Sequence, residues 1–511
     1  IVGAGPAGLA TAIRLKTQAR ARGRDLSVAL IDKAPFPGRH VLSGAVMETS
    51  CLEELIPGWR GHPVSAFCDL HPVEREEVRI LFPGASFAIP SFLLPSGMKH
   101  QGDHLVVLSR LVQWLTREAL ALGVEVHHGF SAASLVWEGD RVAGVTLVDQ
   151  GRGPDGEPQK NFLKGETVHS GVTVLADGPR GVLSREFVGR VGGNIHPQIY
   201  SVGVKQVFRL PKGHAFGLGR IVHTLGWPEP MDVFGGGFLY SMGEEYLAVG
   251  LILGLDWPYV DLEPQRELEF YKTHPFVAQF LKGATIVSAG AKTIPEGGWF
   301  SLPTLWARGA LLVGDAAGLV NMEKIKGLHN AIRSGMAAAD AILDGDLAAY
   351  PQGLETRGVL SEMRHARNFR QAFRWGLLTG MPLSLVSHLL PFRIPAGKDH
   401  EATCATRVLA RQTTPVLDRA AFAGLANTAH REDAPSHLVI VDPEVCARCQ
   451  TDMEAPCTRF CPTEVYRLSG ERLHVSATNC VHCGTCAVKC PYQNIVWTSP
   501  EGGQGPRYKM M

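Results

Sequence analysis

The chain has 511 residues, more than one hydrophobic core usually holds, so about two or three domains are expected. Its 50 Lys and Arg residues balance 49 Asp and Glu residues, which argues against nucleic acid as a partner, because such proteins usually carry a strongly basic face. Eight of the 11 cysteines lie between Cys446 and Cys490, and this uneven use in a long chain favours metal-ligating thiolates over a disulfide scaffold.

Residues 1–12 read as a strand, a glycine turn and the start of a helix. Gly3 would allow the tight turn, Gly5 would let the backbone approach a pyrophosphate, and Gly8 would permit close packing of helix on strand. The phosphates would lie at the helix N-terminus, where free N–H groups favour anions. The next strand ends in Asp32, at the usual distance for a carboxylate that binds the adenosine ribose. This combination predicts a dinucleotide cofactor.

Two later segments favour a flavin over a nicotinamide cofactor. One buried strand runs into a turn at Gly178, and another ends in Gly314-Asp315 and is followed by Gly318. This order of segments is similar to flavoproteins with a glutathione-reductase-like fold, in which a strand ending in Gly-Asp places its carboxylate on the ribityl chain of the flavin. The resemblance implies FAD, with these four residues among those that bind it.

The distance between these segments predicts an inserted substrate domain, in an α/β fold with a glutathione-reductase-like FAD-binding domain. Within the FAD-binding domain, a helix is expected to begin at a Ser109 cap. The expected ranges are 1–80 and 300–375, with part of 105–185, for the FAD-binding domain, 80–105 and 186–300 for the inserted domain, and 400–511 for an iron–sulfur domain.

Two stretches, residues 80–98 and 375–392, are unusually apolar and carry no Asp, Glu, Lys or Arg. Their lengths approach the ~20 apolar residues that a membrane-spanning helix needs, but their five prolines each remove a backbone donor. Interior packing is one interpretation. The pair, with Arg374 and Arg393 bracketing the second stretch, favours a patch that lies in the plane of a membrane and does not cross it.

The C-terminal cysteines follow the spacing of a bacterial ferredoxin, Cys-x2-Cys-x2-Cys-x3-Cys-Pro. Three ligands of a [4Fe–4S] cluster would be Cys480, Cys483 and Cys486, and Cys461, which also precedes a proline, is the candidate for the fourth. By the same symmetry a second cluster is possible. Zinc is the alternative metal, although its all-cysteine sites use paired CxxC motifs. The possible second ligand set is Cys446, Cys449, Cys457 and Cys490.

These motifs together resemble the electron-transfer-flavoprotein:ubiquinone oxidoreductase family over essentially the whole chain. The segments that carry the resemblance best are residues 477–486, 492–497 and 500–508. The resemblance implies FAD, a ferredoxin-like domain with one [4Fe–4S] cluster on Cys461, Cys480, Cys483 and Cys486, and an inserted quinone-binding domain. It further implies that Gly235 and Gly236 lie close to ubiquinone, that reduced electron-transfer flavoprotein is the electron donor, and that no catalytic side chain is needed.

The second set of cysteines departs from the mitochondrial members and is closer to the ferredoxin-like partner of a bacterial nitrogen-fixation flavoprotein. The sequence is therefore compatible with one cluster or with two. It is also compatible with a fusion of that flavoprotein with its ferredoxin. The expected location is monotopic, on the cytoplasmic face of a bacterial inner membrane or the matrix face of the mitochondrial inner membrane.

Three other functions fit parts of the sequence. A prenyl reductase or flavin hydroxylase would share the FAD motifs but would not require the ferredoxin-like domain. A non-catalytic electron carrier or membrane adaptor would need cluster ligands but no quinone pocket. A subunit of a nitrogen-fixation-type or bifurcating complex would be favoured by two clusters.

Overall fold

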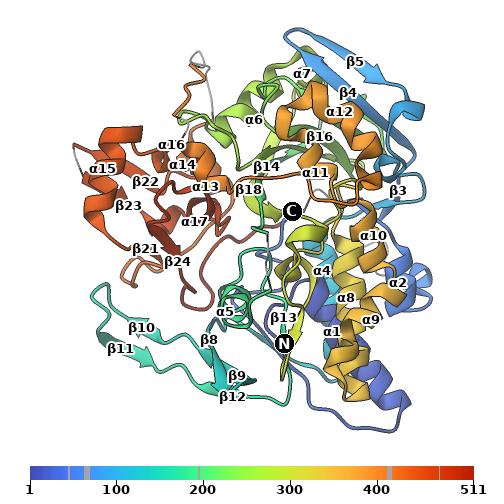
Figure 1. The fold of residues 1–511 in the computed structure, drawn as a ribbon, viewed down its shortest axis with the longest axis vertical. Helices are drawn as coiled ribbons and strands as arrows, with labels where there is room; N and C mark the ends of the chain where they lie inside the picture. Colours follow the sequence, from blue (N-terminus) through green and yellow to red (C-terminus); the bar gives the residue numbers. More distant parts are fainter. Residues whose placement is uncertain (44–45, 63–69, 194–195, 405, 411–416, 471) are drawn as a thin grey trace.

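The computed structural model describes residues 1–43, 46–62, 70–193, 196–404, 406–410, 417–470 and 472–511. Three structural parts lie against one another: a nucleotide-binding part with a parallel sheet, a second part built on a large mixed sheet, and a C-terminal module, the dark-orange and red group on the left of Figure 1. The mixed α/β fold class is confirmed, whereas the exact domain ranges stay a prediction.

The nucleotide-binding part is a parallel sheet covered by helices. Val2 bridges β1 and β13, so the strands run β7, β1, Val2, β13 and β20, and β19 adds antiparallel at the edge. Helix α1 packs on α8 so closely that a Cβ on Gly335 would lie 2.3 Å from the Ala7 carbonyl oxygen. The bounds are α1 Pro6–Ala21, α8 Leu328–Asp344, β1 Ala29–Asp32, β7 Glu125–His128, β13 Thr173–Leu175, β19 Trp306–Ala307 and β20 Ala310–Leu312.

Helix α4 (Leu108–Ala121) is present, but the prediction that Ser109 caps it is wrong. The helix begins at Leu108, and Ser109 lies in its first turn with a buried side chain. The Ser109 hydroxyl donates to the Lys509 carbonyl at 3.2 Å, and its backbone N–H donates to the Met511 carbonyl at 2.8 Å. Ser109 therefore binds the C-terminal end of the chain, a long-range contact that helix-start signals do not reveal.

The second part is a seven-stranded sheet in the order β18-β14-β17-β16-β15-β4-β5. Its strands are antiparallel to their neighbours except for the parallel pair β15 and β4, and β14 to β17 are almost completely buried. The strand bounds are β4 Arg75–Phe82, β5 Ala85–Ile89, β14 Tyr200–Arg209, β15 Arg220–Gly226, β16 Gly235–Met242, β17 Tyr246–Gly254 and β18 Thr285–Pro295.

Shorter elements complete the structure. The strands are β2 Val46–Met47, β3 His71–Pro72, β6 His104–Leu105, β8 Ala132–Glu138, β9 Arg141–Leu147, β10 Gln150–Arg152, β11 Pro158–Leu163 and β12 Thr167–His169. The helices are α2 Ser50–Leu55, α5 Val182–Val191, α6 Pro264–Thr273, α7 Pro275–Leu281, α9 Tyr350–Thr356, α10 Val359–His365, α11 Phe369–Ala372, α12 Leu377–Val386, α13 Asp399–Thr403 and α14 Arg419–Leu425.

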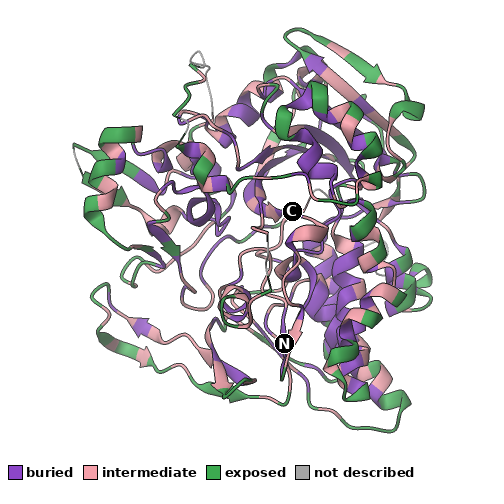
Figure 2. Ribbon diagram, viewed as in Figure 1, coloured by how far each residue is buried: buried purple, intermediate pink, exposed green. Residues whose placement is uncertain are grey.

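The two apolar stretches do not form long helices. Residues 80–98 contribute to the β4–β5 hairpin and then to two short 3-10 turns, and residues 375–392 contain α12. Within the described residues, no helix is long and apolar enough to cross a membrane. Both stretches expose large apolar side chains, including Phe92 at 79% and Leu378 at 76%, in the region of α12 and β5 that is largely green in Figure 2.

The C-terminal module is a doubled arrangement of strand pairs and short helices. Strand β21 pairs with β24, and β22 pairs with β23, so the first and last strands meet around the inner hairpin. Short helices precede each Cys-Pro step of the chain. The bounds are β21 Leu438–Ile440, α15 Pro443–Met453, α16 Cys457–Phe460, β22 Tyr466–Ser469, β23 Arg472–Val475, α17 Thr485–Lys489 and β24 Ile495–Trp497.

Candidate functional site

A cavity of about 330 Å³ begins at the N-terminus of α1 and extends to β14 and β18 of the large sheet. Gly3, Gly5, Asp32, Gly178 and Asp315 all line it, so the structure brings together five of the eight residues predicted to bind FAD. They come from four separate strand ends of the parallel sheet. A cavity at the carboxyl ends of parallel strands is where dinucleotides bind in this class of fold.

The α1 end of this cavity fits a pyrophosphate. A Cβ on Gly3 would lie 2.3 Å from the Ala176 carbonyl oxygen, and its φ of +105° also requires glycine. Gly5, by contrast, has nothing within 4 Å of a Cβ position, so its backbone borders open space. Asp32 accepts backbone N–H groups from Ala4 and Ala34, both at 2.7 Å, which fixes the carboxylate at the cavity wall.

The other three predicted residues do not line the cavity. A Cβ on Gly8 would lie 2.0 Å from the Gly3 carbonyl oxygen, so Gly8 permits helix–strand packing. Gly314 lies against Ala7, and Gly318 lies beside the Gln198 side chain. Their small size shapes the turn that carries Asp315, and burial raises the pKa of Asp315 to about 6.

Basic side chains that the sequence did not indicate surround the same cavity. Lys33, Lys205 and Lys292 line it, and burial lowers the pKa of both Lys33 and Lys205 to about 7. Both ring nitrogens of His40 are buried there and have no hydrogen-bond partner. Buried cations and unpaired donors fit an anionic cofactor with many acceptor atoms. Lys205 and Lys292 lie on β14 and β18, which are distant in sequence from the fingerprint, so no local motif could have indicated them.

A second pocket, of about 200 Å³, adjoins the first. Gly235 and Gly236, for which quinone contact is predicted, line it, and residues of both apolar stretches form its outer walls. A Cβ on Gly236 would lie 2.4 Å from the Thr224 carbonyl oxygen, so only glycine fits between these strands. The two pockets share walls formed by Ser43, Phe238, Ile252, Ile294, Val320, Ile325, Gly327 and Leu328.

Few polar groups face this mostly apolar pocket. His223 on β15 and Tyr240 on β16 both line it, and the Tyr240 hydroxyl shares a hydrogen bond with His223 Nε2. Burial lowers the pKa of His223 well below its usual range, and nearby His100 and Lys326 act in the same direction. His223 is therefore a neutral imidazole at neutral pH, with one proton-donating and one proton-accepting nitrogen.

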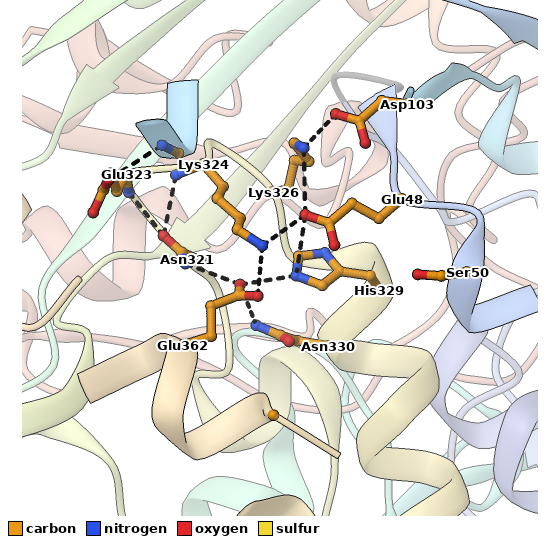
Figure 3. A network of polar contacts seen from close by, with 12 residues as sticks. Glu48, Ser50, Asp103, Asn321, Glu323, Lys324, Lys326, His329, Asn330 and Glu362 are labelled. Carbon is orange, nitrogen blue, oxygen red and sulfur yellow. Dashed lines mark hydrogen bonds and ion pairs between the residues drawn. The ribbon is translucent and has the colours of Figure 1, made fainter. Parts of the chain in front are cut away.

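The loop of residues 321–327 separates the two pockets and is held by a charged network (Figure 3). Lys324 donates to Glu362 at 2.7 Å and to Glu48 at 2.8 Å, and His329 Nε2 lies 2.8 Å from Glu362. Lys326 forms an ion pair with Asp103. The loop contributes Ile325, at a φ of +55°, and Gly327 to the wall that both pockets share, so the network fixes that wall.

The predicted cluster loop lies directly at the first cavity. Cys483 and Gly484 line it together with Gly3 and Asp315, although Gly3 and Cys483 lie near opposite ends of the chain. Lys292 Nζ donates to the His482 carbonyl at 3.3 Å. A group held by this loop would therefore be adjacent to a cofactor in the cavity.

The four cysteines of the first set are buried and unpaired. Burial raises the pKa of Cys486 to about 12, and the neighbouring Cys483 adds to this effect. Thiolates crowded in this way need cations among them, which the iron atoms of a cluster provide. Cys461 Sγ accepts the Val465 N–H at 3.4 Å and Cys480 Sγ accepts the His482 N–H at 3.4 Å. The set comprises Cys461, Cys480, Cys483 and Cys486.

The second set also converges on one small pocket, which Cys446, Cys449, Cys457 and Cys490 line together. All four are free of disulfides. Burial raises the pKa of Cys449 to about 12, and Cys490 and Cys446 raise it further. Helix α15 places Cys446 and Cys449 three residues apart, on the same face.

Three family models match separate parts of the chain. The model described as electron transfer flavoprotein-ubiquinone oxidoreductase, 4Fe-4S, matches residues 415–509, and the model described as ETF-QO, ubiquinone-binding, matches residues 200–294. An NAD(P)-binding Rossmann-like domain model matches residues 1–67. The three matches fall on the C-terminal module, the large sheet and the α1 fingerprint.

Full-length relatives agree with these matches. The chain is 37% identical to a probable mitochondrial electron transfer flavoprotein-ubiquinone oxidoreductase of Schizosaccharomyces pombe, over 100% of this chain and 85% of that protein. It is 35% identical to the mitochondrial electron transfer flavoprotein-ubiquinone oxidoreductase of Homo sapiens, over 100% of this chain and 88% of that protein.

Solved structures are similar in fold only. A geranylgeranyl bacteriochlorophyll reductase-like protein from Thermoplasma acidophilum superposes with a TM-score of 0.53 at 18% identity, covering 76% of this chain and 95% of that one. The flavin-dependent halogenase CmlS superposes with a TM-score of 0.52 at 18% identity, covering 78% of this chain and 68% of that one.

Proposed function

Because the chain belongs to the electron transfer flavoprotein-ubiquinone oxidoreductase family, we propose that its larger cavity binds FAD and that the adjoining apolar pocket binds ubiquinone. The activity of the family is electron transfer from electron transfer flavoprotein, through a [4Fe–4S] cluster and FAD, to ubiquinone. The assignment of each group to particular residues is our proposal.

The cavity residues divide by chemistry into two ends. At the α1 end, the free N–H groups of the helix and the open space beside Gly5 receive the pyrophosphate, and Asp32 binds the adenosine ribose. At the other end, Asp315 would bind the ribityl chain, and Lys205 and Lys292, which line the cavity there, would hold the flavin ring. When bound, FAD supplies two-electron chemistry and the cluster supplies one-electron transfer, while the protein sets distance and orientation.

Cys461, Cys480, Cys483 and Cys486 hold the cluster that lies beside FAD. The support is that all four thiols are buried together and that Cys483 lines the FAD cavity. Thr293 and Lys292 on β18 bind the carbonyl groups of this loop and keep it against the cavity.

Ubiquinone occupies the second pocket with its head group at Gly235 and Gly236. Since a side chain at Gly236 would collide with the Thr224 carbonyl, the glycines keep the two strands close while leaving the pocket side of the backbone bare. In this assignment the quinone head group lies beside the flavin end of the first cavity, which the lining residues shared by the two pockets support.

Reduction of a quinone to a quinol also needs two protons, and we assign their delivery to His223 and Tyr240. They are the hydrogen-bonded pair on the wall of this pocket. A neutral imidazole can release a proton from one nitrogen and take one up at the other. His100 packs against His223, with their ring centroids 5.1 Å apart. The Nδ1 atom of His100 lies 3.3 Å from the carboxylate of Glu76, and this half-buried carboxylate connects the histidine pair to solvent.

The apolar surface around α12 and the β4–β5 hairpin is the membrane-facing side. Phe87, Phe92, Leu378, Leu389 and Phe392 are exposed there, and the pocket that we assign to quinone is walled by neighbouring residues of the same two stretches. Contiguous exposed apolar surface of this kind marks a binding surface, and a lipid-soluble substrate requires a pocket that borders the bilayer. This arrangement supports a monotopic protein that takes ubiquinone directly from the membrane.

The observation that carries the proposal is that one continuous set of walls joins the cluster loop, the FAD cavity and the apolar pocket. The test is anaerobic: reduced electron transfer flavoprotein is mixed with the purified protein and a short-chain ubiquinone, and quinol formation is followed. We expect catalytic quinol formation that Cys483→Ala abolishes and Cys404→Ala, at an exposed cysteine, leaves intact. Reduction of FAD without quinol formation would refute the quinone assignment.

A further inference from the structure

The second set of cysteines, which the proposed function does not use, is arranged like the first set. Four thiols, two from α15, one from α16 and one directly after α17, line one small pocket in the outer half of the C-terminal module. The rest of the lining is mainly apolar and includes Val445, Ala455, Leu473 and Ile495. A pocket lined by four free, unpaired thiols and apolar groups has the donor set of a metal site.

The two halves of the module repeat the same turn around their Cys-Pro cysteines. Asn494 donates its N–H to Cys490 Sγ at 3.3 Å, as Val465 does to Cys461 Sγ at 3.4 Å, in each case from four residues farther along the chain. The residues before these donors, Gln493 and Glu464, have φ values of +52° and +56°. Cys490 is therefore held in the same local geometry as Cys461, a ligand of the first cluster.

The spacing of the sulfurs is wider than a single metal ion needs and fits a cluster better. A tetrahedral zinc with Zn–S bonds of ~2.3 Å needs ligand sulfurs about 3.8 Å apart. Among the described residues, no group of three or more candidate ligand atoms within 4.8 Å of one another contains a cysteine. This holds for both sets of cysteines, and the corners of a [4Fe–4S] cluster hold sulfurs farther apart than one ion does.

One additional donor supports the ligand role. The Asn494 side-chain amide donates to Cys446 Sγ at 3.2 Å, so Asn494 binds two of the four sulfurs and also accepts the Asp442 N–H at 2.9 Å. Hydrogen bonds to ligand sulfurs stabilise thiolates and tune the reduction potential of a cluster. Asn494 is buried and directed into this pocket.

We propose that Cys446, Cys449, Cys457 and Cys490 hold a second [4Fe–4S] cluster, which carries electrons from the protein surface to the first cluster. The inference rests on the proposed function in taking the first cluster as its acceptor. The second cluster takes one electron from reduced electron transfer flavoprotein and passes one electron to the first cluster, so it returns to its oxidised state and no atoms are transferred.

The positions of the two sites in the module set this order. The first site is fully buried beside the FAD cavity, whereas the second lies under α15, whose other face exposes Ala447, Arg448 and Thr451. Cys457 and Cys461 lie one helical turn apart, at the start of α16 and directly after it, and belong to different sites. The exposed face of α15 therefore lies over the second site, and α16 connects the second site to the first.

The primary test needs no variant: iron and acid-labile sulfide are measured per FAD in protein purified without oxygen. Two clusters predict about eight iron and eight sulfide per FAD, and one cluster predicts about four of each. Paramagnetic resonance of the dithionite-reduced protein should show two interacting spins. The proposal would be overturned by one equivalent of zinc per FAD. It would also be overturned if the wild type contained about four iron atoms per FAD and Cys449→Ala/Cys457→Ala kept all of them.

Variants separate this proposal from the first-cluster assignment. Cys449→Ala/Cys457→Ala should halve the iron content and leave one uncoupled spin signal, and Cys404→Ala should change neither. If Cys483→Ala retains its full iron content, the first-cluster assignment fails instead. In stopped-flow mixing with reduced electron transfer flavoprotein, the double variant should reduce FAD at least several-fold more slowly. An unchanged rate would refute the relay role.

Discussion

Thr293 binds the cluster loop through two donors: its hydroxyl donates to the Cys483 carbonyl at 2.9 Å and its backbone N–H donates to the same oxygen at 3.1 Å. The strand that carries it, β18, belongs to the seven-stranded sheet, whereas Cys483 belongs to the C-terminal module. Because Cys483 also lines the larger cavity, this contact fixes the distance between the proposed cluster ligand and the proposed FAD site.

Thr293→Val should weaken this junction without leaving a cavity, because valine has nearly the same shape as threonine. The variant loses one buried hydrogen bond and leaves the backbone bond, so we expect a loss of about 1 kcal/mol in the free energy of unfolding. Thr293→Ser keeps the hydroxyl and is the matched control. Urea titration measures the free energy of unfolding, and the rate of iron release to a chelator measures how firmly the loop around Cys483 is held. Equal iron release from both variants would contradict the role of the hydroxyl.

Gly236→Ala should block quinone reduction selectively. The new Cβ would lie 2.4 Å from the Thr224 carbonyl oxygen, a separation that forces β15 and β16 apart at the pocket. We expect quinol formation to fall strongly while electron transfer flavoprotein still reduces FAD. Gly189→Ala is the control, because a Cβ there has open space and the residue is helical. Normal quinol formation by Gly236→Ala would contradict the proposed position of the quinone.

The parts of the site that could be predicted are those encoded by short spacings. Gly3, Gly5 and Asp32 are brought together by one strand–helix–strand unit, and the cysteine runs lie in one small module, so local patterns suffice. Lys205 and Lys292 could not be found in this way. They reach the cavity only because β14 and β18 pair far from the fingerprint, and burial of a lysine is decided by that tertiary packing.

The first apolar stretch illustrates a different difficulty. Composition indicated a membrane patch but not its secondary structure, and the stretch folds partly as the β4–β5 hairpin at the edge of the sheet. A signal was present: Pro83-Gly84 occupies the turn, and Gly84 has a φ of +79°, as position three of a type II turn requires. Apolar content outweighed this turn signal, because exposed apolar residues such as Phe87 do not alternate with polar ones as on an ordinary edge strand.

His223→Leu should slow quinol formation more than it changes quinone affinity. Loss of a positioned proton donor typically costs about 10²-fold or more in rate, so kcat should fall while KM for quinone changes little. Tyr240→Phe should produce a smaller decrease in kcat, and His169→Leu, on an exposed strand, should have no effect. Because burial keeps the pKa of His223 well below its usual range, the wild-type rate should show no inflection from this residue between pH 6 and 8. A change in KM alone would assign His223 to binding.

Replacement of exposed apolar residues should release the protein from membranes. Phe92→Asp/Leu378→Asp places two charges on the most exposed apolar positions of the two stretches, where burial in lipid would be unfavourable. We expect less protein to sediment with phospholipid vesicles, with unchanged reduction of a water-soluble short-chain ubiquinone. Leu163→Asp is the matched control, because Leu163 is 66% exposed on the distant β10–β11 hairpin. Equal vesicle binding by all three proteins would contradict the membrane-facing assignment.

The network behind the 321–327 loop should make stability depend on acid pH through Glu362. Burial alone would raise the pKa of Glu362, but His329 and Lys324 outweigh this effect and hold the pKa well below its usual range. A carboxyl group with a depressed folded-state pKa contributes its full stability above its unfolded pKa of about 4.3, and the contribution disappears as pH falls through the folded value. Glu362→Gln should therefore be less stable than the wild type at pH 7, by about 2 kcal/mol for a partly buried ion pair.

That difference in stability should stay constant from pH 7 to about pH 5.5 and shrink below about pH 4.3, where the unfolded carboxyl group becomes protonated. Urea titrations at several pH values measure it. Glu355→Gln is the control, since its ion pair with Arg364 is exposed at the surface and should contribute little. If the variant also lowers quinol formation while FAD is still reduced, the network acts on the wall that separates the two pockets. A difference in stability that grows on acidification would have the wrong sign for a depressed pKa and would refute this account of the network.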